Sequence, residues 1–277
     1  MKRWCCQLWI GCLLLSSVAF AQDRPLVTEK TDTVPVGRIR TELGFDFLQD
    51  AVFRLSGLEG DLTRLAVVGL RIGAGKKVEI RLSWTAQQFL NVRRRFPAPN
   101  SDLLNFSGNS TSDVGDLLMS TKARFVDELG RRPAVGFEFG VQLPNGATER
   151  GLSTDETNFY SSLLVQKNLG RLRLIGNVGL AILGDPLSAG AQDDLLSYGL
   201  AAEYSVTPEL SLLGDWYGRA GPGGYGTEEQ SRLRLGARIN AAGLYWDGAL
   251  LLGFLDTDPS TGLIVGLSKD FDFPFLR

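Results

Sequence analysis

The feature that most restricts the fold of this chain is a repeated alternation of apolar and polar residues, beginning near residue 36. In the first such segment Ile39 and Leu43 fall on one side of an extended chain, whereas Arg40 and Glu42 fall on the other. A period of two places successive side chains on opposite faces of a β-strand. The chain is therefore predicted to be all-β, with strands that have one apolar and one wet face.

About twelve segments carry this alternation, and the connections between them alternate in length. Long connections are predicted at 48–61, 87–112, 144–156, 183–193 and 219–230, and short ones at 73–76, 129–131, 169–170, 207–208 and 241–243. Outer-membrane barrels join their strands by short periplasmic turns and longer extracellular loops. We therefore predict a transmembrane antiparallel up-and-down β-barrel of about 12 strands, with both termini periplasmic. A soluble periplasmic β-sandwich is the alternative fold.

The N-terminus has the layout of a cleaved secretory signal peptide, predicted at residues 1–21. Lys2 and Arg3 precede the apolar stretch 9–18, and Ala19-Phe20-Ala21 matches an A-x-A cleavage site. The stretch 22–35 is polar with two prolines and is predicted to be a periplasmic N-terminal tail. Residues 36–277 form the predicted barrel domain. No segment after the signal has 18 consecutive apolar residues, so a membrane-embedded chain would have to cross as a closed barrel. The predicted location is the cell outer membrane.

The composition excludes several kinds of chemistry from the exported chain. All three cysteines lie in the predicted signal peptide, and the sequence contains no histidine. Outer-membrane phospholipases, deacylases and omptin-type proteases rely as families on a catalytic histidine. We therefore predict that the protein is not an enzyme, and that it has no catalytic residues, no cofactor and no metal site. The formal net charge is −2, so nothing suggests a nucleic-acid partner.

The polar faces of the predicted strands carry many charges of both signs. In a barrel these faces line the lumen. The charges form either a polar conduit or a set of salt-bridge networks that plugs a narrow barrel, and both interpretations remain open at this point. The lumen-lining candidates are Arg38, Arg40, Glu42, Glu79, Arg81, Lys122, Arg124, Glu138, Arg171, Arg173, Glu203, Arg232, Arg234 and Arg238.

An ordered series of glycine-containing motifs resembles one family of barrels. The series covers about residues 114–270 and comprises Gly115-Asp116-Leu117 with the strand that leads to Phe125, Leu143-Pro144-Asn145-Gly146, Thr154-Asp155, Gln166-Lys167-Asn168-Leu169-Gly170, Gly176-Asn177-Val178-Gly179 and Gly184-Asp185-Pro186. It is similar to the phenol-degradation meta-pathway outer-membrane proteins, often labelled transporters. The resemblance implies an outer-membrane barrel that admits hydrophobic or aromatic compounds.

Two functions are consistent with these observations. The first is an outer-membrane channel or transporter for passive uptake of small molecules, with selectivity set by lumen charges and by an inward fold of loop 87–112. The second is a structural or surface-display barrel with a plugged lumen and no transport activity. In both cases the expected partners are outer-membrane lipid, lipopolysaccharide and the barrel-assembly machinery, for which Phe275 is the predicted signal. The first function adds a small-molecule solute.

Overall fold

The computed structural model describes residues 24–273, so the predicted signal peptide and Phe275 lie outside the described residues. The strands are β1 (Arg38–Phe53), β2 (Leu58–Gly75), β3 (Val78–Arg95), β4 (Ser110–Asp113), β5 (Leu117–Val126), β6 (Ala134–Leu143), β7 (Asn158–Leu169), β8 (Leu172–Gly184), β9 (Gln192–Ser205), β10 (Leu210–Ala220), β11 (Gln230–Ala241), β12 (Leu244–Gly253) and β13 (Thr261–Asp272). Two single 3₁₀ turns, η1 (Ser101–Leu103) and η2 (Thr148–Arg150), lie in loops. No helix in the described part of the chain is long and apolar enough to cross a membrane.

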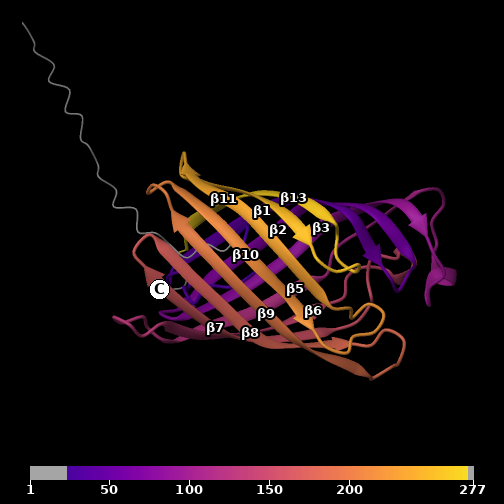
Figure 1. The fold of residues 1–277 in the computed structure, drawn as a ribbon, viewed down its shortest axis with the longest axis horizontal. Helices are drawn as coiled ribbons and strands as arrows, with labels where there is room; N and C mark the ends of the chain where they lie inside the picture. The colour runs from indigo at the N-terminus through magenta and orange to yellow at the C-terminus, as the bar shows by residue number, and fades with distance from the viewer. Residues whose placement is uncertain (1–23, 274–277) are drawn as a thin grey trace, which may run out of the picture.

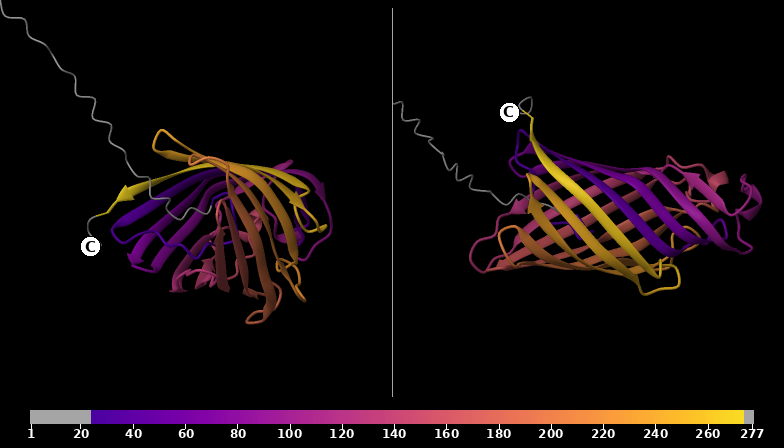
Figure 2. Two further views of the ribbon diagram at one scale, coloured as in Figure 1. Left: turned by 60° about the vertical axis from the view of Figure 1, so that its left-hand side comes forward. Right: turned by 90° about the horizontal axis from the view of Figure 1, so that it is seen from above.

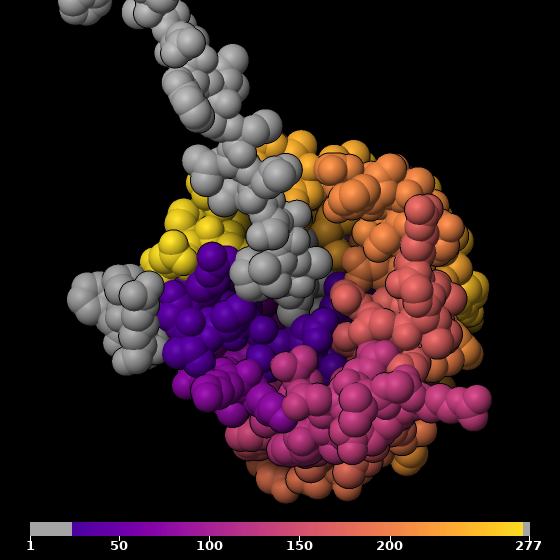
Figure 3. Space-filling view, turned by 90° about the vertical axis from the view of Figure 1, so that its left-hand side faces the viewer, coloured from indigo at the N-terminus to yellow at the C-terminus, as the bar shows by residue number. Residues whose placement is uncertain are grey.

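The strands form one closed antiparallel sheet (Figure 1). Each strand pairs with its neighbours in the sequence, and β13 pairs with β1 from Arg38 opposite Asp272 to Gln49 opposite Thr261. Short β4 and longer β5 both pair with β3, at different heights, and therefore share one position in the ring. The result is a 12-strand barrel, which confirms the predicted fold class. Figure 2 shows yellow β13 beside indigo β1, and Figure 3 shows the colours running once around the ring.

The two faces of the sheet differ in chemistry. Leu200, Trp216 and Leu235 are large apolar side chains exposed on the outside, whereas Arg40 and Glu79 are almost fully buried on the inside. In a soluble sandwich the apolar face would point inward, so this arrangement excludes that alternative. An apolar outer face around a polar interior is the arrangement of a transmembrane barrel.

Placing a charge on the outer face provides a test of this orientation. Leu235 is 53% exposed near the centre of β11. Leu235→Arg is expected to lower the free energy of unfolding by about 2–4 kcal/mol in lipid, because arginine would meet hydrocarbon. Urea titration of the protein refolded in liposomes measures the change. The control is Leu129→Arg, at an exposed turn outside the strands, where we expect almost no effect. Equal losses at both positions would contradict the orientation.

Two predicted loops are wrong, because strands β1, β2 and β3 are longer than the alternation indicated. Predicted loop 48–61 is reduced to residues 54–57, and the β3 end of predicted loop 87–112 remains strand to Arg95.

At the long-loop end of β1, β2 and β3 the two faces of the sheet exchange their polarity: apolar residues point inward and charged residues point outward. The inner residues form one buried cluster, which includes Leu48, Ala51, Leu58, Leu62, Leu90 and Val92. On the outside, Arg93 pairs with Asp50 at 2.9 Å and with Asp61 at 2.5 Å.

This reversal follows from a change of solvent. Where strands rise above the bilayer they meet water, so apolar side chains gain by pointing inward, as in a soluble protein. A bulge at Asp50, which has φ of 52°, also breaks the period of two. Residues 96–109 then cap this end, and Leu104 and Phe106 pack against the buried cluster. The other long connections lie close to their predicted positions.

Candidate functional site in the barrel lumen

The polar segment before β1 lies inside the barrel. The Arg24 guanidinium is 3.5 Å from the Asp247 carboxylate, and the Val34 amide donates a 2.7 Å hydrogen bond to Glu79. The predicted periplasmic tail 22–35 is therefore wrong for its described residues, 24–35. A polar composition did not distinguish a free tail from this position, because the lumen wall is itself polar and satisfies the same groups that water would.

The inner wall is shaped to receive this segment. A Cβ atom at Gly266 would come within 2.6 Å of the Arg24 side chain, and one at Gly44 would meet the same guanidinium. A Cβ atom at Gly199 would meet Thr28. Glycine at these positions leaves the space that the segment occupies.

One end of the segment is held by β10. The Asp215 carboxylate accepts hydrogen bonds from the Val27 amide at 2.5 Å and from the Thr28 amide at 3.2 Å, and the Thr28 hydroxyl donates to it as well. Asp215 is 1% exposed. Unpaired backbone amides and a buried carboxylate would each carry a desolvation cost, so this mutual pairing stabilises the segment in the lumen.

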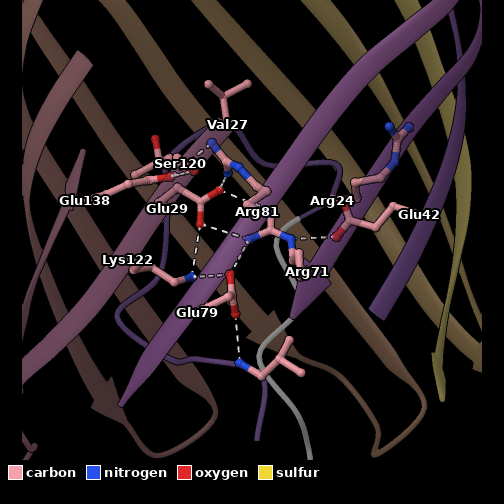
Figure 4. A network of polar contacts seen from close by, with 12 residues as sticks. Arg24, Val27, Glu29, Glu42, Arg71, Glu79, Arg81, Ser120, Lys122 and Glu138 are labelled. Atoms are coloured by element: carbon pink, nitrogen blue, oxygen red, sulfur yellow. Dashed lines mark hydrogen bonds and ion pairs between the residues drawn. The ribbon is translucent and has the colours of Figure 1, made fainter. Parts of the chain in front are cut away.

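The centre of the segment is Glu29, which three cations of the barrel wall surround (Figure 4). Arg71 Nη2 lies 3.1 Å and Lys122 Nζ 3.2 Å from its carboxylate, and Arg81 also pairs with it. These cations come from β2, β5 and β3, so a single side chain joins three strands to the segment. The Asn177 side chain completes the site by exchanging two hydrogen bonds with the Glu29 backbone.

The wall contributes further carboxylates to this cluster. Glu42 accepts from Arg71 Nε at 2.9 Å, and Glu79 lies 3.1 Å from Arg71 and 3.3 Å from Lys122. Glu138 lies 3.1 Å from Arg81. Charges of both signs therefore alternate in space, which offsets the cost of their burial.

The next residues of the segment contact the opposite wall. Lys30 is fully buried and lies 2.7 Å from Glu203, which also pairs with Arg238 at 2.9 Å and with Arg173 at 3.2 Å. Asp32 follows and returns to β5, where it lies 3.2 Å from Arg124. The segment thus makes ionic contacts around most of the barrel circumference.

The structure places the predicted lumen residues on the inner side of their strands, with one exception. Arg171 is exposed in the turn between β7 and β8, because β8 begins only at Leu172. Arg38 and Arg40 pair with Asp272 and Asp270 along the β1–β13 seam. The remaining candidates contact the segment, Arg71, Glu203, Asp258 or one another; they are Glu42, Glu79, Arg81, Lys122, Arg124, Glu138, Arg173, Glu203, Arg232, Arg234 and Arg238.

Sequence reasoning missed three of the residues that matter most. Arg71 lies in a segment with weak alternation, although Gly69 and Gly73 flank it on the same face and could have indicated it. Glu29 and Lys30 lie outside every strand pattern, so no local signal placed them in the lumen.

Three chambers follow one another along the lumen. The outer chamber, near the long loops, has a volume of about 470 Å³ and is lined by residues that include Leu48, Leu62, Arg64, Leu152, Arg219 and Arg232. The middle chamber has about 350 Å³ and is lined by residues that include Ser120, Ser162, Ser197 and Tyr217. The periplasmic chamber has about 660 Å³ and is lined by residues that include Arg173, Glu203, Arg238 and Tyr245.

The chambers are not equally connected. The outer and middle chambers share Leu118, Gln142 and Tyr160 in their linings, so they adjoin at this neck. The middle and periplasmic chambers share no lining residue; Glu29 faces the former and Lys30 the latter. The N-terminal segment therefore separates the two halves of the lumen.

An apolar exterior, a charged lumen and an internal segment define the class: a transmembrane β-barrel whose lumen its own N-terminal segment divides. The sequence matches the family described as "Putative MetA-pathway of phenol degradation" over residues 22–243, and the chain belongs to this family. This confirms the resemblance seen in its motifs. Among curated proteins no sequence matches.

One solved structure shows the same fold, and a second has a lower similarity. The COG4313 outer membrane channel from Pseudomonas putida F1 is similar with a TM-score of 0.63 and 18% identity, over 87% of this chain and 98% of that chain. The Pseudomonas putida toluene transporter TodX has a TM-score of 0.40 and 10% identity, over 87% of this chain and 90% of that chain.

Proposed function

We propose that this protein is an outer-membrane channel for the passive uptake of small molecules, hydrophobic or aromatic compounds among them. The observation that carries the proposal is the pair of adjoining chambers that leads from the loop end to the N-terminal segment. A barrel filled by side chains would have no such space. The segment is held by ion pairs and hydrogen bonds, which can exchange with water when it moves.

The proposed solute class rests on two supports. The family is described by a pathway of phenol degradation, which handles aromatic compounds. In the outer chamber, the half-buried side chains of Val52, Phe53 and Leu118 offer apolar surface to a solute ring. A chemical step is not part of this proposal, and lipopolysaccharide and the barrel-assembly machinery remain its expected membrane partners. The adjoining chambers favour a channel over a plugged display barrel.

Electrical recording tests the channel directly. Purified protein in planar bilayers is expected to give discrete current steps, small because the segment narrows the lumen, and liposomes that contain it are expected to leak small solutes. Empty bilayers and protein denatured before reconstitution are the controls. Absence of both current and leak would exclude a channel and support the plugged barrel.

A further inference from the structure

The arginines of the outer chamber differ from the cations of the central cluster in having few anionic partners. In the central cluster Arg71, Arg81 and Lys122 each have at least one carboxylate within 3.3 Å. In the outer chamber Arg64 and Arg219 have none within ion-pair distance among the residues that the structure describes. Within residues 24–273, the one arginine of this chamber that has an ion pair is Arg232, which lies 2.7 Å from Asp258.

The surroundings of these two arginines make the lack of partners informative. Arg219 donates Nε to the Glu228 backbone carbonyl at 2.7 Å, which leaves its remaining donors without a carboxylate. Arg64 lies opposite Asp46 in the strand register, yet it forms no ion pair with Asp46. Both side chains are partly buried and line the same chamber. Asp46 attracts Arg64, and Glu228 attracts Arg219, but neither carboxylate is in ion-pair contact, so guanidinium donors remain for an anion that enters.

The carboxylates of the chamber are already engaged by their own loops. Asp116 accepts hydrogen bonds from the Gln142 side chain at 2.7 Å and from the Asn145 amide at 3.1 Å. Glu228 accepts from the Gly226 amide at 2.8 Å. These local bonds hold the carboxylates at the wall, so they do not neutralise Arg64 and Arg219 by contact.

Apolar side chains share the chamber with these arginines. Val52, Phe53 and Leu118 lie in its lining, and all three are half-buried, so part of each side chain faces the chamber. A volume of about 470 Å³ falls in the range of ligand pockets. The combination fits a ligand with one anionic group and a compact apolar body.

We propose that the outer chamber is a binding subsite for small organic anions, an aromatic carboxylate being the best fit, with Arg64 and Arg219 as its anion-binding residues. Guanidinium groups bind carboxylates through paired charge-assisted hydrogen bonds, and the half-buried apolar side chains of the lining cover the ring. The subsite deepens the proposed channel function and rests on it: the solute is captured here before it passes the neck at Tyr160.

The test compares permanently charged aromatic probes, which do not cross lipid unaided. Liposomes with the full-length exported chain are given benzenesulfonate or phenyltrimethylammonium. Wild-type protein is expected to admit the anion at least about tenfold faster than the cation, and the double variant Arg64→Gln, Arg219→Gln to lose this preference. The matched control is Arg93→Gln, an arginine of the outer surface, which should keep it. Gel mobility with and without heating verifies that every variant is folded.

A binding measurement separates the subsite from the channel. Calorimetry with benzenesulfonate on the detergent-solubilised protein needs no passage, and the double variant is expected to bind at least about tenfold more weakly than wild type or the control. Equal entry of both probes into wild-type liposomes would overturn the anion subsite and leave the channel standing. Entry of neither probe would contradict the channel. In that case calorimetry tests the subsite by itself. The subsite would be overturned if wild-type protein did not bind benzenesulfonate, or if the double variant bound it as tightly as wild type.

Discussion

Deletion of residues 25–35 is expected to raise the single-channel conductance severalfold. These residues separate the middle chamber from the periplasmic chamber, and their removal joins the two into one passage. Conductance follows the narrowest part of a pore, so the largest change is expected where the segment crosses the lumen. Planar-bilayer recordings of wild type and deletion variant at the same salt concentration measure it.

The deletion leaves Arg71, Arg81 and Lys122 without Glu29, which could impair folding, so a second variant tests the same idea with the segment retained. A Cβ atom at Gly199 would lie 3.2 Å from the Thr28 Cβ, so a shift of a few tenths of an ångström would bring the pair to the separation of about 3.5–4.5 Å found in disulfides. Thr28→Cys with Gly199→Cys should therefore form a disulfide that locks the segment to β9. The natural cysteines, all before residue 13, would be removed with the predicted signal peptide.

The locked variant is expected to conduct less than wild type when oxidised and to regain conductance on reduction. Thr28→Cys alone is the control and should respond to neither treatment. Unchanged conductance in both the deletion and the oxidised double variant would show that the segment is not the barrier.

How much of this molecule could be predicted from its sequence depended on the solvent at each position. Where a strand has one face toward the membrane and the other toward the lumen, the alternation was clear, as at Ile39 and Arg40. It was sufficient to predict the barrel and most of the inward-facing charges. Above the bilayer both sides of the sheet obey the rule for a soluble protein, so Leu62 and Val92 reversed the pattern and their strands were taken for loops. The period of two is informative only while the solvents on the two faces stay the same.

The internal segment could not be predicted for a different reason. Its contacts join residues far apart in the sequence, such as Lys30 with Glu203 and Thr28 with Asp215. No periodic pattern encodes such pairs, and a polar stretch with two prolines is equally suited to water. The outer-chamber arginines were ambiguous as well: Arg232 was predicted to face the lumen, but only the structure separates paired from unpaired arginines.

The largest loss of stability is expected from Arg71, which joins the segment to the barrel wall. Its guanidinium is 4% exposed and lies within 3.1 Å of Glu29, Glu42 and Glu79. Arg71→Met keeps the length of the side chain but leaves three carboxylates with one cation fewer. Removal of one partner from a buried ion pair costs about 3–5 kcal/mol, and we expect a loss in this range. Urea unfolding of the refolded protein measures it.

Two controls separate burial from charge alone. Arg93→Met removes an arginine that also pairs with two carboxylates, but one that is 50% exposed, so a loss of at most about 1 kcal/mol is expected. Adding Glu29→Gln to Arg71→Met should restore part of the lost stability, because it removes one of the carboxylates left in excess. Two outcomes would contradict coupling within the cluster. The first is an equal loss of stability in Arg71→Met and Arg93→Met. The second is a double variant in which the losses from Arg71→Met and Glu29→Gln simply add. A coupled result would mean that the charges which hold the segment in the lumen also stabilise the barrel around it, so that opening the passage costs part of the stability of the fold.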